Sequence, residues 1–204
     1  RRKSTFKKMK ENYQILVIGS VKSTAQTIKS LLLHDFNIVG VLGFEPERRN
    51  QVSGWYNLKK LALDNKIDFK DFVKVNQKEC IEWAKERRPD IIFAVGFSQL
   101  LNEDWFHIPK LGIIGFHPTS LPKGRGRAPL AWAILEERSA SATFFLLEEG
   151  ADSGPIFIQE LIQLSEDDDA SSLEKKIIGA IKVSLRKWLP KLKAGIWNPK
   201  PQNE

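Results

Sequence analysis

Short apolar runs alternate with stretches of helical periodicity along this sequence from Tyr13 onwards. Apolar strands joined through helices are typical of βαβ units, whose parallel strands are buried on both faces. The predicted strands are 14–18, 37–42, 72–75, 90–95, 111–116, 142–147 and 156–164. The predicted helices are one that opens at Ser23 and those at 58–63, 77–87, 128–136 and 171–190. The expected fold class is therefore α/β, an open, mostly parallel, twisted sheet of Rossmann-like type with helices on both faces.

The last predicted helix has recognisable ends. Ser171, with Glu174 three residues later, forms a candidate capping box, and an apolar stripe follows it. Pro190 is expected to end the helix because proline lacks the backbone N–H that continues the hydrogen-bonded turns. Between the second strand and the next helix, residues 43–53 are polar and predict a long exposed loop.

The charge is concentrated at the N-terminus. The 204 residues carry a formal net charge of +7, but five positive charges and no acidic residue lie in the first eight positions. Residues 1–12 are therefore expected to form a basic, disordered leader, with a nucleic-acid-binding arm as the alternative. Residues 13–204 are expected to form a single domain whose small net charge makes nucleic acid an unlikely partner.

A single cysteine, Cys80, excludes a disulfide framework and any site built from several cysteines. No apolar run approaches the roughly 20 residues of a membrane-spanning helix. No apolar segment follows the first charges, as it would in a secretory signal. The sequence therefore predicts a cytoplasmic protein with no membrane partner.

Polar segments follow several of the predicted strands. In a doubly wound sheet the ligand site lies at the carboxyl ends of the strands, which directs attention to 96–101, 117–129 and 148–154. His117 directly follows a predicted buried strand, and prolines and glycines fix the path of the chain after it. Asp152 lies in a glycine-flanked turn. If the two turns meet, the Asp152 carboxylate can accept a hydrogen bond from one ring nitrogen of His117 and leave the other nitrogen for substrate.

Other kinds of site are less well supported. His34 and His107 are expected to be structural, and a strand-capping role stays open for His117. A serine nucleophile is not favoured because no G-x-S-x-G turn is present. The turn at 19–24 matches neither phosphate-binding motif, and no His, Cys and Asp cluster has the spacing of a metal site.

Two strings, FHPTSLPKGRGRAPLAWAIL and TFFLLEEGADSGPIFIQ, resemble the folate-dependent formyltransferases. The resemblance runs from about Tyr13 to the C-terminus. This family includes enzymes that act on methionyl-tRNA, on glycinamide ribonucleotide and on sugar nucleotides, and the pattern is closest to the sugar-nucleotide N-formyltransferases. The resemblance implies the formyltransferase fold and transfer of a formyl group from 10-formyltetrahydrofolate, as co-substrate, to a primary amine without a metal.

The resemblance also assigns residues. His117 matches the family's catalytic histidine and Asp152 the aspartate that tunes it. Gly115 stands two residues before the histidine, where the family usually has an asparagine that helps to hold the oxyanion of the intermediate. The positions that match folate-binding residues are Gln99, Leu100, Leu101, Arg127, Glu148, Glu149, Gly150, Ala151 and Asp152.

Gly115 leaves three alternatives open. Another donor replaces the asparagine, the reaction is slow, or the protein binds folate in its cleft without transferring a formyl group. The loss of one oxyanion donor typically lowers the rate by about 10²–10³. The candidates for a substitute donor are Ser98, Asn102 and Thr119. An active enzyme is favoured because the rest of the site pattern is maintained.

The expected acceptor is a small molecule, an amino sugar linked to a nucleotide and used in surface-polysaccharide synthesis. Arg48, Arg49 and Arg125 are candidate partners for its phosphates. Methionyl-tRNA and glycinamide ribonucleotide are the alternatives. A tRNA-directed enzyme would need a further C-terminal domain, before which this sequence would be truncated. Aromatic residues near both termini leave a homodimer open.

Overall fold

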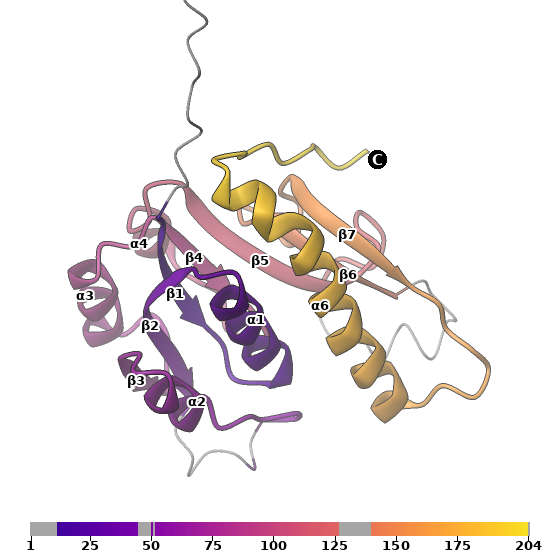
Figure 1. Ribbon diagram of the computed structural model, residues 1–204, viewed down its shortest axis with the longest axis horizontal. Helices are drawn as coiled ribbons and strands as arrows, with labels where there is room; N and C mark the ends of the chain where they lie inside the picture. Colours follow the sequence, from indigo (N-terminus) through magenta and orange to yellow (C-terminus); the bar gives the residue numbers. More distant parts are fainter. Residues whose placement is uncertain (1–11, 45–49, 51, 127–139, 204) are drawn as a thin grey trace, which may run out of the picture.

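The computed structural model describes residues 12–44, 50, 52–126 and 140–203, and these build one twisted sheet (Figure 1). Its strands are β1 (Gln14–Ile18), β2 (Asn37–Phe44), β3 (Phe69–Phe72), β4 (Ile91–Ala94), β5 (Gly112–Thr119), β6 (Ala140–Leu146) and β7 (Ile156–Ile162). In the described part of the chain the sheet has seven strands in the order β3-β2-β1-β4-β5-β6-β7. Neighbours from β3 to β5 are parallel, whereas β5–β6 and β6–β7 are antiparallel pairs.

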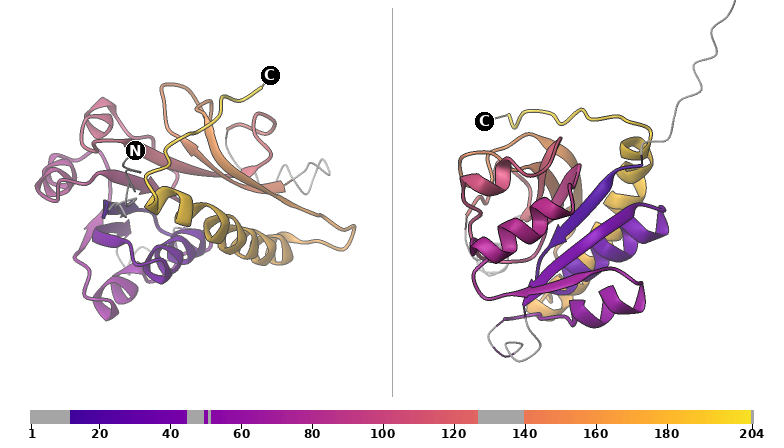
Figure 2. Two further views of the ribbon diagram at one scale, coloured as in Figure 1. Left: turned by 45° about the horizontal axis from the view of Figure 1, so that its top comes forward. Right: turned by 90° about the vertical axis from the view of Figure 1, so that its left-hand side faces the viewer.

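Helices cover both faces of this sheet (Figure 2). They are α1 (Lys22–Leu33), α2 (Leu58–Asp64) and α6 (Ala170–Lys193) on one face, and α3 (Lys78–Glu86) and α4 (Glu103–Phe106) on the other. The central strand β1 is fully buried on both sides, because Ile15 and Val17 join one apolar core while Leu16 and Ile18 join the other. The predicted α/β class, with its open and mostly parallel sheet, is confirmed.

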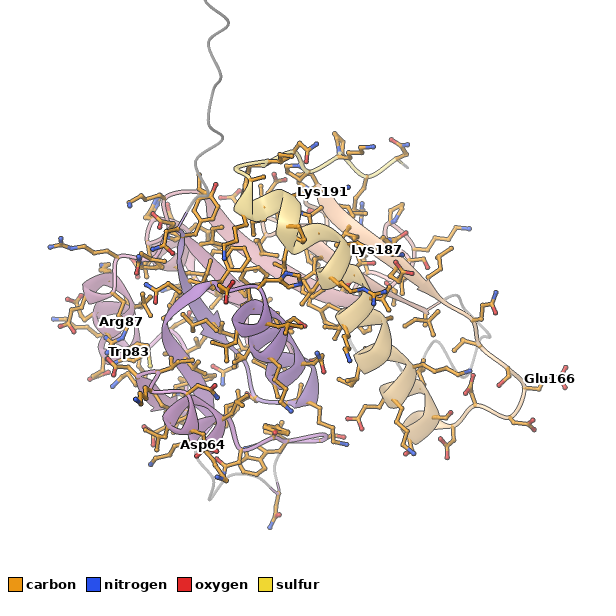
Figure 3. The ribbon with its side chains drawn as sticks, viewed as in Figure 1. Asp64, Trp83, Arg87, Glu166, Lys187 and Lys191 are labelled. Atoms are coloured by element: carbon orange, nitrogen blue, oxygen red, sulfur yellow. The ribbon has the colours of Figure 1, made fainter. Side chains whose placement is uncertain are left out.

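Helix α6 packs its apolar stripe across the antiparallel end of the sheet. The predicted stripe residues are all buried: Leu173, Ile177, Ile181, Leu185 and Trp188. The Trp188 ring lies between those of Phe144 and Phe157, at centroid distances of 6.2 and 4.8 Å. On the polar side of the helix, Lys187 Nζ lies 2.6 Å from Glu160 Oε2 on β7, and Figure 3 labels this lysine.

The start of α6 differs from the prediction. The residue before the helix is Asp169, whose side chain accepts a hydrogen bond from Ser172 N at 2.7 Å, while Asp169 N donates to Ser172 Oγ at 3.0 Å. The predicted capping box at Ser171 and Glu174 is therefore wrong by two positions. Glu174 instead forms an ion pair with Lys22 of α1.

The end of α6 also differs, since the helix continues through Pro190 to Lys193. Leu189 and Leu192 are both fully buried. Burying two leucine side chains contributes about 3–6 kcal/mol, at about 1.5–3 kcal/mol each, and proline disrupts a helix by about 3 kcal/mol. Packing against the sheet therefore extends the helix beyond the proline.

The bounds of β2 and β3 also differ from the prediction, because the two strands pair with each other. The third strand is Phe69–Phe72 and not 72–75, because these residues pair with Val41–Phe44 of β2. Strand β2 also takes up two residues of the predicted 43–53 loop. The predicted helix at 128–136 lies outside the described residues, as do residues 1–11 of the predicted leader and most of the rest of that loop.

Candidate functional site

His117 lies inside strand β5 and not after it, because β6 pairs with β5 through this position and sets His117 opposite Thr143. Its side chain is buried, with 6% of the residue exposed. His117 Nε2 is 2.8 Å from the carbonyl oxygen of Gly124, in the turn that follows β5. A carbonyl oxygen only accepts, so Nε2 carries a proton in this contact. The ring is thus fixed on one side by the backbone of its own turn.

Asp152 approaches the other ring nitrogen. Its Oδ2 lies 3.5 Å from His117 Nδ1, an ion-pair distance when the ring is protonated, and accepts a hydrogen bond from Gly126 N at 2.9 Å. Asp152 has a positive φ of 54°, which places it in the left-handed region that aspartate tolerates better than most residues. The structure therefore brings together the two turns that the sequence analysis paired.

The turn around Asp152 depends on a glycine. A Cβ atom at Gly154 would lie 1.7 Å from the carbonyl oxygen of Leu146, a backbone atom that cannot move aside. Just beyond Gly154, the end of β6 is joined to the start of β7 by a hydrogen bond from Leu146 N to Pro155 O at 2.9 Å. Only glycine at this position lets the chain turn tightly enough to carry Asp152 back over β5.

Gly115 lies two residues before His117 on the same face of β5, between Ala94 of β4 and Phe145 of β6. A Cβ atom built at Gly115 would lie 2.8 Å from Leu147 Cδ2 and 3.0 Å from Phe145 Cζ. Real Cβ atoms essentially never show the first of these separations. Leu147 therefore occupies the space into which a side chain at position 115 would project.

The three candidate substitute donors differ in their contacts. Thr119 Oγ1 donates to Lys123 O at 2.9 Å, and Asn102 Nδ2 donates to Asp104 Oδ2 at 3.1 Å, so both donors already serve their own turns. Ser98 is exposed and has no hydrogen bond to any residue that the structure describes. Ser98 therefore has an uncommitted hydroxyl donor, and Asn102 keeps the second N–H of its side-chain amide.

The predicted folate-binding segment after β4 is tied to the end of β3. Gln99 Oε1 accepts from Val75 N at 2.7 Å and its Nε2 donates to Val73 O at 2.8 Å. Asn76 Nδ2 donates to Leu100 O at 2.9 Å. The polar atoms of Gln99 thus hold the loop, while the side chain of Leu100 is 87% exposed at its tip.

The second predicted folate-binding segment is the exposed turn between β6 and β7. Glu148, Glu149, Gly150 and Ala151 are all exposed and precede the half-buried Asp152. Arg127 lies outside the described residues, as do Arg48 and Arg49. Arg125, the third candidate phosphate partner, donates from Nη2 to Gln202 Oε1 at 2.8 Å.

The turn after β1 has few free donors for a phosphate. Ser20 N and Val21 N both donate to Thr24 Oγ1, at 3.2 and 3.3 Å, and Lys22 N donates to Gly54 O at 3.2 Å. These bonds engage the backbone N–H groups at the start of α1. They agree with the absence of a phosphate-binding motif in the sequence.

Three contacts of this site were missed by the sequence analysis: the Gly124 carbonyl, the side chain of Leu147 and the side chain of Gln202. Gln202 donates to the carbonyls of Asp152 and Gly154, at 2.7 and 2.8 Å, from a tail segment with no motif of its own. The repeated glycines at 124 and 126 were a usable signal for close backbone approach. Nothing in the local sequence marks Gln202, because only the folded path of the chain brings it to this turn.

The chain is thus an α/β protein with a Rossmann-like sheet, in which a buried imidazole lies beside a carboxylate. A family model described as formyl transferase matches residues 14–185. The chain therefore belongs to the formyl transferase family.

Two curated relatives illustrate the range of similarity. The chain is 34% identical over 193 residues to the methionyl-tRNA formyltransferase of Kosmotoga olearia, covering 93% of this chain and 62% of that protein. It is 30% identical over 185 residues to the methionyl-tRNA formyltransferase of Clostridioides difficile, covering 89% and 60%. The chain thus spans less than two thirds of the length of these relatives.

Solved structures share the fold at lower identity. A phosphoribosylglycinamide formyltransferase from Streptococcus pneumoniae TIGR4 matches with a TM-score of 0.74 at 15% identity, over 88% of this chain and 98% of that one. WlaRD, a sugar 3N-formyl transferase solved in the presence of dTDP and 5-N-formyl-THF, matches with a TM-score of 0.72 at 19% identity, over 95% and 68%. Within the described ranges, no helix has the length and apolar character needed to cross a membrane.

Proposed function

We propose that this chain transfers a formyl group from 10-formyltetrahydrofolate to a primary amine. One observation carries the proposal: His117 Nδ1 on strand β5 lies 3.5 Å from Oδ2 of Asp152, in the turn after β6, in a chain of the formyl transferase family. An imidazole held by a carboxylate is suited to move a proton during acyl transfer. The proposal assigns His117 as the catalytic residue and Asp152 as the group that orients it.

In the proposed reaction, the lone pair of the neutral amine attacks the formyl carbon and forms the new C–N bond. The formyl oxygen becomes an oxyanion, which accepts a hydrogen bond from His117. The intermediate collapses as the bond between the formyl carbon and folate N10 breaks. The proton lost by the amine nitrogen passes through His117 to N10, so the products are a formamide and tetrahydrofolate.

The contacts of His117 suggest how the ring meets its substrate. Nε2 donates to Gly124 O at 2.8 Å, so a substrate oxyanion would compete with this carbonyl for the same proton. A charged oxygen is the stronger acceptor. Asp152 would stay beside Nδ1 and balance the positive charge that the ring carries once it is protonated.

Folate is proposed to lie between the two segments named by the sequence analysis. Leu100 offers exposed apolar surface at the tip of one segment, and the 148–152 turn offers backbone groups on the other. The side chain of Gln99 is engaged with the backbone of 73–75, so its contribution is to hold the loop in shape. Arg127 is proposed as a further folate contact on the resemblance alone.

Two acceptors are proposed. Methionyl-tRNA is supported by the relatives named methionyl-tRNA formyltransferase, one of which is 34% identical to this chain. An amino sugar on a nucleotide is supported by the sequence pattern and by the similar fold of a sugar 3N-formyl transferase. Arg125 is exposed and spends two of its five N–H donors on Gln202 Oε1, so it stays in the proposal as a phosphate partner of the nucleotide through its other donors.

The experiment is a formyl-transfer assay with 10-formyltetrahydrofolate and three acceptors: methionyl-tRNA, a set of nucleotide-linked amino sugars, and glycinamide ribonucleotide. Wild type is expected to formylate at least one acceptor. His117→Ala and Asp152→Ala are expected to lose most turnover while circular dichroism shows an intact fold. Calorimetry with a stable folate analogue runs beside the assay. Binding of the analogue without turnover on any amine would replace the proposal with a folate-binding protein.

A further inference from the structure

The C-terminal segment returns to the candidate site after α6. The chain leaves the helix and runs beside β7 (Figure 1). Lys200 pairs with Ile156 through two backbone hydrogen bonds, Ile156 N to Lys200 O at 2.7 Å and Lys200 N to Ile156 O at 2.8 Å. The Trp197 ring packs on Phe157 at a centroid distance of 4.7 Å. These contacts deliver the next residues to the turn that holds Asp152.

Gln202 uses its whole side-chain amide at this turn. Nε2 donates to the carbonyl oxygens of Asp152 and Gly154, at 2.7 and 2.8 Å. Oε1 accepts from Arg125 Nε and Nη2, at 3.2 and 2.8 Å. The two carbonyls can only accept and the guanidinium can only donate. The four contacts therefore place the NH2 of the Gln202 amide toward the carbonyls and its oxygen toward Arg125.

Together with the contacts described above, these hydrogen bonds form a closed network. Gly126, the neighbour of Arg125, donates its N–H to Asp152 Oδ2, and Gln202 bonds both the backbone of Asp152 and the side chain of Arg125. The network joins the turn after β5, the turn after β6 and the C-terminal segment. Asp152 is thereby held through both its carboxylate and its main chain.

Asp152 needs such support because its φ of 54° is uncommon for a residue with a side chain. Strained backbone of this kind persists only when its surroundings hold it in place. A small rotation of the Asp152 peptide would swing Oδ2 away from His117 Nδ1. The two hydrogen bonds from Gln202 hold the chain on the C-terminal side of Asp152, one at its own carbonyl and one at that of Gly154.

We infer that Gln202 is a positioning residue, which holds Asp152 at ion-pair distance from the ring of His117 by bonding the backbone of its turn. Gln202 touches neither the ring nor the carboxylate oxygens in this arrangement. Its effect on catalysis rests on the proposed function, whereas its effect on the geometry of His117 does not.

The test compares Gln202→Glu and Gln202→Ala with wild type, and uses Asn203→Ala as the matched control because Asn203 is the exposed neighbour on the same segment. Glutamate keeps the length of the side chain and can accept from Arg125, but it cannot donate to the two carbonyls. Alanine removes both sets of contacts. The glutamate variant therefore separates the bonds to the Asp152 turn from the anchoring of the tail.

The first measurement is the nitrogen-15 spectrum of the imidazole rings at a fixed pH. The chain has three histidines, so His34→Gln and His107→Gln assign the signals of His117. Both Gln202 variants are expected to shift the His117 ring signals in the same direction as Asp152→Asn, and Asn203→Ala is expected to leave them in place. His117 signals at their wild-type positions in both Gln202 variants would overturn the inference.

The second measurement is kinetic, on whichever acceptor is formylated. Misplacement of a catalytic group lowers turnover, so kcat of Gln202→Glu is expected to fall about tenfold while KM for the formyl donor stays within about twofold. A lower melting temperature with unchanged kcat and unchanged His117 signals would mean that Gln202 only anchors the tail, and would overturn the inference. If wild type transfers no formyl group, the proposed function fails, and the spectra alone decide the role of Gln202.

Discussion

Gly115→Asn introduces the asparagine that the family resemblance implies at position 115, and the structure predicts that the substitution destabilises the fold without raising kcat. The new Cβ would lie 2.8 Å from Leu147 Cδ2, 3.0 Å from Leu147 Cγ and 3.0 Å from Phe145 Cζ. Favourable carbon contacts lie at about 3.5–4.0 Å. Overpacking of this kind costs about 1–3 kcal/mol. Because Leu147 is half-buried and can rotate outward, we expect a loss near the lower end.

Leu147→Ala provides the matched background for this prediction, because it removes Leu147 Cδ2 and Cγ, two of the three atoms nearest to the new Cβ. One oxyanion donor is worth about 10²–10³ in rate, so the double variant Gly115→Asn/Leu147→Ala is expected to exceed Leu147→Ala in kcat by at least about tenfold. Gly179→Asn is the control for glycine replacement, since a Cβ at Gly179 meets no atom within 4 Å. Urea unfolding and initial rates of formyl transfer measure the two effects.

The reasoning fails if Gly115→Asn alone is as stable as wild type and turns over faster. That result would mean that Leu147 does not fill the position of the asparagine in solution. Equal rates for Leu147→Ala and the double variant would also contradict the reasoning. They would mean that the asparagine amide, even with Leu147 removed, does not stabilise the oxyanion.

Three further predictions follow from particular contacts. Leu185→Ala, at a fully buried position of α6, is expected to lower the free energy of unfolding by about 2–5 kcal/mol in urea titrations, and an unchanged midpoint would contradict the packing of this helix. Gly154→Ala is expected to abolish formyl transfer, because its Cβ would strike the Leu146 carbonyl and displace the Asp152 turn; wild-type turnover would refute this. A hydrogen bond from Lys176, supported by Ser165 N and Ser172, holds the pKa of Asp168 well below its usual range. The charged carboxylate therefore stabilises the fold above the unfolded-state pKa of about 3.9, and this contribution is lost as the pH falls further. Asp168→Asn is expected to melt below wild type at neutral pH, with a gap that narrows below about pH 4; a gap that does not narrow on acidification would contradict the assignment.

The sequence predicted best what depends on local apolar patterns. Strand β1 was predicted with its observed bounds, Gln14–Ile18, because residues 15–18 form one unbroken apolar run that is buried on both faces of the sheet. The stripe of α6 was likewise correct from Leu173 to Trp188. The capping box was wrong because Asp168, Asp169, Ser171 and Ser172 offer several similar registers, and local sequence alone does not choose between them.

The rest of the site depends on pairings that are remote in sequence. His117 belongs to β5 only because β6 arrives antiparallel beside it, from the far side of residues 127–139. The approach of Asp152 was expected only on the condition that the two turns meet. Because β6 is antiparallel to β5 and ends opposite Ile114, the turn after β6 has to fold back along β5 to bring Asp152 to His117. Two contacts were not predicted: the packing of Leu147 against Gly115 and the hydrogen bond from Gln202 to the backbone of Asp152. Each is set by the path of the backbone and not by a residue pattern.

The claim that His117 and Asp152 work as one unit is tested most directly by a double-mutant cycle. The rate of formyl transfer is measured for wild type, His117→Asn, Asp152→Asn and the double variant with the same donor and amine. A carboxylate that acts through the imidazole has nothing to act on once the ring is gone. The double variant is therefore predicted to be no slower than His117→Asn, which itself loses on the order of 10²–10⁴. A double variant whose loss equals the product of the two single losses would contradict the pairing, as would wild-type rates in either single variant.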